Sequence, residues 1–430
     1  MQVCGIEFRE DGNLIHNSYM PWATAFSVAF AVRCCIALVF LLAVCQVHGE
    51  TERVRVLYIG EPMKSPLPFF VALINDPFFD LTPVQAFTYN LPAEIARRSV
   101  RRYMPRTYDG LTGYHTVTLI YADARLFSPQ WKTWFSQAVL DGIGFTFSGQ
   151  DVNRYDFLWE WLESTVGDVL PVERPWIPEI EVMMGEQPGS ITVVKPNHPL
   201  MASLPWNDMG RHGNFFDCTQ IDAKQGSETL AELVTPFGQK NPFLVWWEVG
   251  GGRSLAIMTR FSSDHRNADD PFYEWPYLGD FACNFHLFMA GREIPEDVEI
   301  LHTVRTTWME SYLVKNMLVG SIDFISKLGG NPAPLEAMLK EVEEKLAKSR
   351  VLYLEYEFEE SLELAERMVG DLGRVSAETV KVKDQVFLTI YLIEWSVLMS
   401  TGMVTGVVVW SLMVRRRLYK EAGSTRMSMV

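Results

Sequence analysis

The sequence predicts an α/β protein with a parallel sheet, followed by a helical segment and a C-terminal transmembrane helix. Short apolar runs that end in Gly or Asp alternate with helical patterns over residues 54–291. Amphipathic helical repeats follow up to residue 384, and residues 395–414 are 20 consecutive uncharged residues. Strands that alternate with helices indicate a parallel sheet with right-handed crossovers. A stretch of about 20 apolar residues matches the thickness of a hydrocarbon core.

The strands come first along the chain. Residues 54–60 and 116–122 are short apolar runs, each typical of a buried strand, and residues 144–149 and 191–194 supply two more. Two further runs, 244–249 and 253–259, flank three glycines and predict a β-hairpin.

Helix signals separate these strands. Ser128-Pro129 predicts an N-cap with Pro at the first helical position, and Gly142 is placed where a helix C-terminus favours a left-handed residue. Residues 281–289 suggest a closing helix, and residues 306–327 predict another that ends at Gly329. An apolar stripe from Leu335 onward predicts further helix, which we expect Gly370 and Gly373 to break.

The C-terminal span has a predicted orientation. Arg415, Arg416 and Arg417 follow the apolar stretch at once, and basic residues of this kind mark the cytoplasmic side. Gly402 and Gly406 form a Gly-x-x-x-Gly pair, and Glu394 lies near the outer end of the span. Such small residues let helices approach closely, so these three residues are candidates for membrane association in a homo-oligomer or a membrane complex.

The N-terminal apolar segment, 20–47, allows two interpretations. The 12-residue run 34–45 after Arg33 is typical of a signal peptide, whether cleaved or retained. The alternative is an N-terminal anchor with Arg33 in mid-span, which is energetically costly. Both place the large domain outside. We therefore expect the following segments: 1–48 signal peptide or anchor, 49–295 α/β domain, 296–384 membrane-proximal helical domain, 385–414 transmembrane helix, 415–430 cytoplasmic tail.

Charge separates the same segments. The chain carries 38 basic and 53 acidic residues, a net charge of −15. Residues 49–384 hold 31 basic and 48 acidic residues, or −17, whereas residues 385–430 hold 5 and 2, or +3. An acidic domain lacks the basic face of a nucleic-acid binder. We therefore expect a membrane partner and no nucleic-acid partner.

Several motifs in residues 54–291 carry a family resemblance. Residues 120–124 (Ile-Tyr-Ala-Asp-Ala), the Ser128-Pro-Gln helix and residues 141–147 resemble a recurring block of the class I glutamine amidotransferase-like superfamily. Residues 197–205 and 242–253, with Ser263-Asp264-His265, resemble its ThuA-like branch. The resemblance implies a flavodoxin-like parallel sheet sandwich. Residues 413–419 look similar to the end of membrane-anchored amidotransferase-like proteins.

The resemblance does not extend to the nucleophile. Amidotransferases of this superfamily use a Cys at a tight strand-to-helix turn, whereas the corresponding strand here ends at Ser148. Ser148 is a candidate nucleophile only beside a base, and the histidines at 198, 212 and 265 and Glu248 are the candidates. The simpler interpretation is that Ser148 forms a turn and His198 caps the following segment.

Ligands of such sheets bind at the carboxyl ends of the strands. We therefore expect any pocket near Asp123, Ser148, His198 and His265, with Asp264 and Glu248 as further ligand-pocket candidates. The many tryptophans suggest either saccharide stacking surfaces or core packing. Cys218 and Cys283 form one disulfide or remain two buried thiols, and no C-x-x-C motif predicts a zinc or redox centre. We expect no cofactor.

Two functions follow. The preferred one is a membrane-anchored extracytoplasmic protein with a non-catalytic amidotransferase-like domain that acts in ligand binding or assembly at the cell surface. The alternative is a hydrolase of a saccharide or amide with His198 or His265 as catalytic group. The hydrolase requires Ser148, His198 and His265 to surround one cleft.

Overall fold

The structure is a computed structural model, and it describes residues 52–62, 68–88, 91–148, 157–175, 186–211, 215–217, 221–258 and 275–427. All the elements below belong to one structural unit, Arg53–Val430. The strands are β1 (Val54–Gly60), β2 (Phe79–Gln85), β3 (Thr116–Ile120), β4 (Gly144–Ser148), β5 (Val172–Glu173), β6 (Glu186–Pro188), β7 (Ser190–Val193), β8 (Phe215–Asp217), β9 (Asp222–Ala223), β10 (Glu228–Val234), β11 (Lys240–Val249) and β12 (Gly252–Ile257). The helices are α2 (Pro68–Asn75), α3 (Ala93–Tyr103), α4 (Tyr108–Thr112), α5 (Pro129–Leu140), α6 (Phe157–Leu162), α7 (Pro199–Ala202), α8 (Leu278–Met289), α9 (Val298–Lys327), α10 (Ala333–Leu354) and α11 (Phe358–Met427), with short 3-10 turns at Ala124–Leu126, Thr165–Val169 and Trp206–Arg211.

Eight strands form one mixed sheet in the order β2-β1-β3-β4-β12-β11-β10-β7. The strands from β2 to β12 pair in parallel, and β11, β10 and β7 add antiparallel pairs at the other side. The β3–α5–β4 crossover therefore joins two neighbouring parallel strands. This confirms the predicted α/β fold with its parallel sheet, helical segment and long apolar C-terminal helix. Two small two-stranded sheets, β5-β9 and β6-β8, accompany the main one.

Local chemistry explains the predicted helix and hairpin ends. The Ser128 hydroxyl accepts a hydrogen bond from the Trp131 amide and so caps α5, as the Ser-Pro signal predicts. Gly142 has φ of 119° directly after that helix. Gly250 has φ of 62° in the turn between β11 and β12, a conformation that glycine adopts without steric cost.

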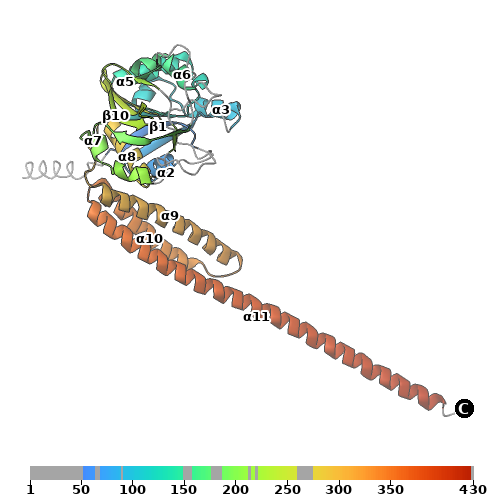
Figure 1. The fold of residues 1–430 in the computed structure, drawn as a ribbon. Coiled ribbons are helices and arrows are strands. Elements are labelled where there is room, and N and C mark those ends of the chain that lie inside the picture. The colour runs from blue at the N-terminus through green and yellow to red at the C-terminus, as the bar shows by residue number, and fades with distance from the viewer. Residues whose placement is uncertain are drawn as a thin grey trace, which may run out of the picture. The chain divides into compact units, whose positions relative to one another are not determined.

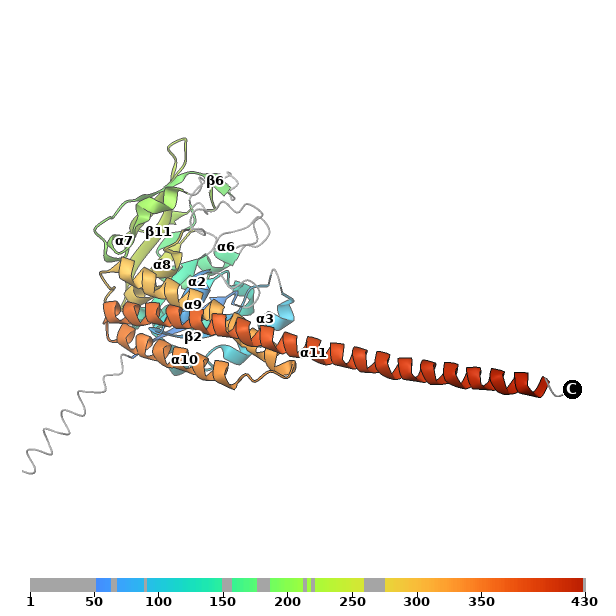
Figure 2. The same cartoon turned by 90° about the horizontal axis from the view of Figure 1, so that it is seen from below.

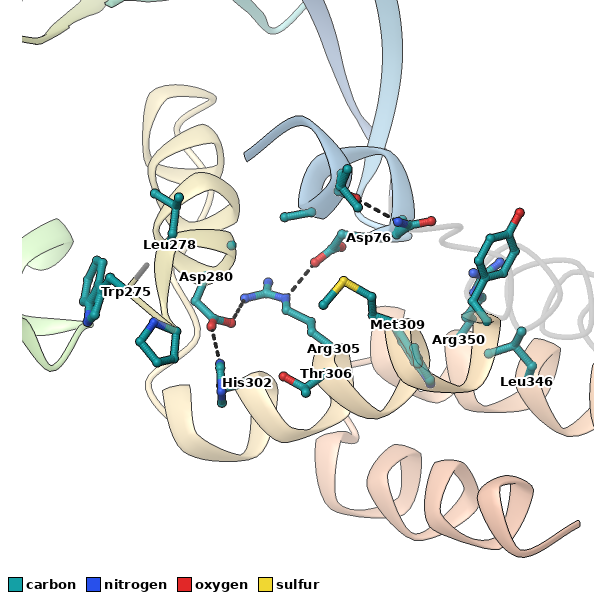
Figure 3. Close-up of a pocket in the computed structure, with 17 residues that line it drawn as sticks. Asp76, Trp275, Leu278, Asp280, His302, Arg305, Thr306, Met309, Leu346 and Arg350 are labelled. Atoms are coloured by element: carbon teal, nitrogen blue, oxygen red, sulfur yellow. Dashed lines mark hydrogen bonds and ion pairs between the residues drawn. The ribbon is translucent and has the colours of Figure 1, made fainter. Parts of the chain in front are cut away.

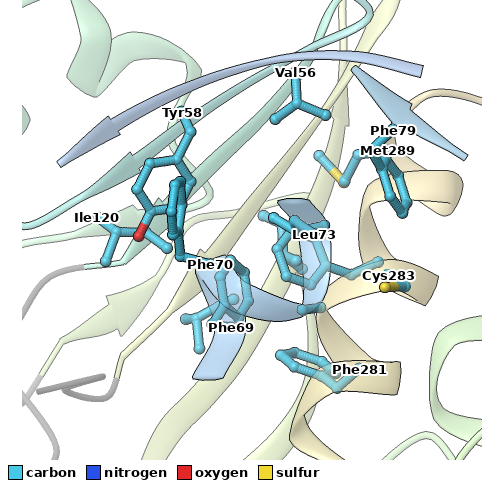
Figure 4. Packing of buried hydrophobic residues seen from close by; sticks show 14 of the residues in the cluster. Val56, Tyr58, Phe69, Phe70, Leu73, Phe79, Ile120, Phe281, Cys283 and Met289 are labelled. Carbon is cyan, nitrogen blue, oxygen red and sulfur yellow. The ribbon is translucent and has the colours of Figure 1, made fainter. Parts of the chain in front are cut away.

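Helices cover both faces of the sheet, with α5 and α6 on one side and α2 and α8 on the other (Figure 1). Aromatic side chains fill the α2–α8 side: the rings of Tyr58 and Phe70 lie 5.0 Å apart, and those of Phe69 and Phe285 5.1 Å (Figure 4). Cys283 lies in this core as a free, fully buried thiol. Cys218, the other cysteine of the two alternatives (one disulfide or two buried thiols), lies outside the described residues.

The C-terminal helices form a bundle that packs against the α/β layer. In Figures 1 and 2, α9 and the shorter α10 run side by side with the first part of α11. Helix α11 presents a buried stripe at alternating spacings of four and three residues, which is the repeat of a helix seam. The stripe consists of Ser361, Ala365, Met368, Leu372, Val375 and Thr379.

The prediction that Gly370 and Gly373 break this helix is wrong, because α11 is continuous from Phe358 to Met427. Both glycines are exposed, and the apolar stripe passes on the opposite side of the helix. A glycine inside a helix costs only about 1 kcal/mol relative to alanine, which packing of the stripe offsets. Helix α9 also begins earlier than expected, because the Asp297 carboxylate accepts from the Ile300 amide and caps it.

Candidate functional site: a cavity between the sheet layer and the helical bundle

Asp123 follows β3 at the carboxyl edge of the sheet and is buried. Its carboxylate accepts hydrogen bonds from the Thr88 hydroxyl at 2.7 Å and from the Arg125 amide and Nε at 3.0 and 2.9 Å. Burial raises the pKa of Asp123, but these bonds outweigh it and hold the pKa below its ordinary value. The carboxylate is therefore engaged in ordering the turn after β3.

Ser148 is the last residue of β4 and is also buried. It pairs with Ile120 of β3 on one side and Ile257 of β12 on the other. Its carbonyl accepts a hydrogen bond from the Tyr121 amide, and Tyr121 has φ of 58°. A large residue in this left-handed region is strained, and such strain clusters at binding and active sites. No sequence signal predicted this strained residue at the carboxyl edge of the sheet.

His198 lies at the N-cap of α7. Its Nδ1 accepts from the Leu200 amide at 3.3 Å, and its ring lies 5.1 Å from the rings of both Trp246 and Phe288. Burial lowers the pKa of His198, and the charge of Arg253 adds to that effect although Glu228 opposes it. The imidazole is therefore a neutral capping group within an aromatic cluster.

Ser148 and His198 lie toward opposite ends of β4. His198 contacts Phe288, and the carbonyl of the next residue, Met289, lies against Gly144, the first residue of β4. Ser148 ends the same strand. The structure therefore does not bring the candidate nucleophile and this candidate base together.

The remaining candidates at the sheet are either exposed or outside the described residues. Glu248 is exposed, and in the β11–β12 strand register it lies opposite Arg253 beside the hairpin turn. Asp264, His212 and His265 lie outside the described residues. Among the residues that the structure describes, no group of three or more His, Cys, Asp or Glu side chains is arranged to hold a metal ion.

A cavity of about 160 Å³ lies where the α/β layer meets the bundle (Figure 3). Helices α2, α8, α9 and α10 line it. Most of its wall is apolar, and charged groups converge at its centre. The apolar and aromatic lining includes Val71, Trp275, Leu278, Trp308, Met309 and Leu346.

Arg305 of α9 is the centre of the charged group. Its Nε donates to Asp76 Oδ2 at 2.8 Å, and its Nη1 donates to Asp280 Oδ1 at 2.7 Å. Tyr353 of α10 donates to the same Asp76 oxygen at 2.7 Å. Asp76 follows α2 and Asp280 belongs to α8, so one guanidinium joins three helical elements. Both carboxylates are almost fully buried. Removal of one partner from a buried ion pair destabilises a folded protein by about 3–5 kcal/mol.

His302 extends this network toward solvent. Its Nδ1 lies 2.6 Å from Asp280 Oδ2, and its ring lies 4.3 Å from the ring of Tyr277. Burial raises the pKa of Asp280, but the hydrogen bond from His302 and the charge of Arg305 outweigh burial and hold that pKa below its ordinary value. Asp280 therefore stays ionised in the cavity wall.

Two buried donors in the cavity wall remain unsatisfied. Arg305 Nη2 and Arg350 Nε have no hydrogen-bond partner among the described residues. Burial lowers the pKa of Arg350, and the charge of Arg53 adds to that effect. A buried donor without an acceptor costs about 1–3 kcal/mol, and because both atoms have almost no accessible surface, an acceptor in the cavity reaches them only after these side chains shift.

None of the described residues that were predicted for a site lies in this cavity. Asp280 lies in a buried, mostly apolar helix whose other polar residues include Asn284 and His286, and an acidic residue in such a place signals a buried pair. Its partner is Arg305, and Asp76 lies 229 residues from that arginine. No local pattern joins residues so far apart, so the signal identifies a buried charge but not its partner.

The C-terminal candidates lie on α11, the described helix that is long and apolar enough to cross a membrane. The most apolar stretch of α11 has no residue buried against the rest of the protein. Glu394, Gly402 and Gly406 are all exposed there. A Cβ added at either glycine would meet no atom within 4 Å. A Cβ at Gly370 would likewise meet no atom within 4 Å. Gly370 precedes Gly406 by 36 residues, about ten turns of an ideal helix, so the two glycines lie on the same face of α11.

No known family pattern matches this sequence, and no curated protein is significantly similar to it. The similarity to solved structures is low, both in sequence identity and in TM-score. A cytoplasmic protein of Salmonella typhimurium LT2 is 16% identical, with a TM-score of 0.42 over 55% of this chain and 99% of its own. A ThuA-like protein of Parabacteroides merdae is 13% identical, with a TM-score of 0.38 over 57% of this chain and 93% of its own.

Part of an enzyme is also similar. The match to a cold-adapted β-galactosidase of Rahnella is 15% identical, with a TM-score of 0.32, and covers 55% of this chain but 32% of the enzyme. Likenesses this low leave activity, ligand and family to be argued from the residues of this chain.

Proposed function

We propose that this chain is a membrane-anchored extracytoplasmic protein whose α/β domain is non-catalytic and acts in ligand binding or assembly at the cell surface. The observation that carries the proposal is the continuity of α11, which packs in the bundle at its start and continues as an exposed apolar helix. An exposed helical surface of this length is stable in a bilayer and unfavourable in water. The basic residues Arg415–Arg417 favour a cytoplasmic tail.

Two observations support a non-catalytic domain. Ser148 replaces the cysteine that the resemblance would require, and His198 is engaged in capping α7 away from the serine. The hydrolase alternative with Ser148 and His198 therefore lacks the hydrogen-bonded pair that nucleophilic catalysis needs. We do not propose it.

The cavity supports the ligand-binding part of the proposal. Asp76 and Asp280 already neutralise Arg305, so a compact ligand with one acceptor group suits Arg305 or Arg350, which both line the cavity, better than a highly charged anion. A cavity of about 150 Å³ holds one benzene-sized ring. The ligand class is therefore a small ring-sized or short-chain carboxylate.

Anchoring is tested by topology mapping of the full chain in bacterial cells. We expect the chain to stay in the membrane after alkaline carbonate extraction. Protease added outside should digest the acidic domain and spare an epitope placed after Met427. Replacing Arg415–Arg417 with glutamates should increase the fraction with an accessible tail. Release by carbonate, or a tail that the protease removes from the unaltered chain, contradicts the proposal.

Ligand binding is tested by calorimetry on the full chain in detergent with benzoate as probe. Benzoate should bind in the millimolar range or tighter, and the neutral isostere benzamide at least tenfold more weakly, because a charge-assisted hydrogen bond contributes about 1.5–3 kcal/mol. Arg350→Gln should abolish this preference, whereas Arg367→Gln, at an exposed arginine of α11, should retain it. Equal affinities for both probes, or no benzoate binding by the folded chain, would exclude the cavity as a carboxylate site.

A further inference from the structure

Helix α3 is strongly basic within an acidic domain. Residues 93–106 contain five arginines and one glutamate, or +4, whereas residues 49–384 as a whole carry −17. Arg97, Arg98, Arg101 and Arg102 lie in α3, and Arg106 follows it closely. The positive charge of this segment is therefore opposite in sign to the charge of the domain that contains it.

The arginines of α3 are exposed and available. Ala96 and Val100 face the core, and the Ser99 hydroxyl accepts from the Gln85 amide, so the helix is held against β2 by its other face. Arg97 pairs with Glu94 at 2.9 Å on the surface. The other four arginines form no ion pair with the described residues, and all of them are exposed.

Apolar side chains accompany this charge. Ile95 and Tyr103 are 43% and 47% exposed, and the Arg102 guanidinium lies 5.5 Å from the Tyr103 ring centre. A helix that combines arginines with exposed Ile and Tyr has the composition of a segment that binds at a bilayer surface.

The position of α3 identifies the surface it faces. In both views it lies at the side of the α/β layer toward which α11 extends beyond the bundle (Figure 1, Figure 2). The apolar part of α11 that is suited to cross a membrane lies in that direction. A bilayer around α11 therefore faces α3, and the anchor keeps α3 at a high effective concentration near the headgroups.

We infer that α3 docks on anionic lipid headgroups of the bilayer that α11 crosses. Each arginine near an anionic surface adds to the attraction, which opposes the repulsion between the acidic domain and the same surface. Tyr103 and Ile95 enter the interfacial region. The inference rests on the proposed membrane anchoring and adds to it a second, charge-dependent contact.

The test is hydrogen exchange on the full chain reconstituted into vesicles. One vesicle preparation contains phosphatidylcholine alone, and the other contains 30% phosphatidylglycerol. We expect amides of residues 93–104 to exchange at least threefold more slowly in the anionic vesicles, and 0.5 M NaCl to remove the difference. Arg98→Gln with Arg102→Gln should also remove it, whereas Arg98→Lys with Arg102→Lys should retain most of it.

The controls separate this inference from anchoring. Arg367→Gln with Arg374→Gln removes two exposed arginines of α11 and should leave the exchange of α3 unchanged. Flotation with both kinds of vesicle shows that the chain is anchored. If the chain floats but α3 exchanges equally in both, the inference fails and anchoring stands. If the chain does not float, anchoring itself fails. Protection of α3 by added RNA in neutral vesicles would also overturn the lipid assignment.

Discussion

His286 lies fully buried in α8 with both ring nitrogens engaged. Its Nδ1 lies 2.7 Å from the Ala282 carbonyl, which fixes that nitrogen as a donor. Its Nε2 lies 2.9 Å from the Thr118 hydroxyl and accepts from it. Burial lowers the pKa of His286 to about 3, so the folded protein holds a neutral imidazole that the unfolded chain would protonate near pH 6.5.

This difference makes stability depend on pH. Between pH 6.5 and about 3 the unfolded state binds a proton that the folded state does not, so stability falls as the pH falls through this range. At pH 5 the loss from His286 amounts to about 2 kcal/mol. Chemical denaturation in detergent at pH 7 and pH 5 should show His286→Gln to be less stable at pH 7 but to lose about 2 kcal/mol less on acidification. An equal loss in both proteins would refute the assignment.

Single residues with local partners are predictable from the sequence, and those with distant partners are not. Ser128 caps a helix that begins at the next residue, so its role follows from neighbouring residues. Asp123 was expected at a strand end and lies there, but its use in ordering a turn depends on Thr88, which is 35 residues away. Asp76, Asp280 and Arg305 meet only through the assembled fold.

At the scale of elements, α11 shows where local signals mislead. Two glycines three residues apart suggest a break, yet the seam residues on the other side of the helix continue through Leu372 and Val375. Six strands of the main sheet were predicted because their signals are short-range, whereas β2 and β10 were not predicted. A helix stabilised by packing over many turns overrides its local propensity.

The open environment of Gly370 and Gly373 gives a prediction for α11. A Cβ at either position would meet no atom within 4 Å, so alanine should stabilise the helix by about 1 kcal/mol per site. Gly330→Ala is the matched control, because its Cβ would collide with the Ile325 and Val386 side chains and should destabilise the chain. Thermal unfolding of the detergent-solubilised chain measures both. Destabilisation of the Gly370→Ala, Gly373→Ala chain would indicate that another helix packs on this face. The oligomer seam through Gly402 and Gly406 stays a prediction.

At the scale of the whole molecule, the sequence predicts the layers but not how they join. Alternating strands and helices indicate the α/β layer, and the apolar repeat indicates the helices after it. The cavity between them depends on side chains from α2, α8, α9 and α10, which are contributed by residues 71–76, 275–280, 302–312 and 346–350. Such a junction follows from the packing of whole elements, and no single segment carries its signal.

The charged junction also sets an order on folding during synthesis. Asp76 receives its hydrogen bond from Tyr353 only after 277 further residues have been made. At about 5–20 residues per second, this takes roughly 15–55 s. The Arg305 guanidinium, which pairs with the same carboxylate, is made 229 residues after Asp76, so the charge of Asp76 is compensated only after that part of α9 has been made. A chain that stops before residue 305 would therefore hold Asp76 without its cationic partner.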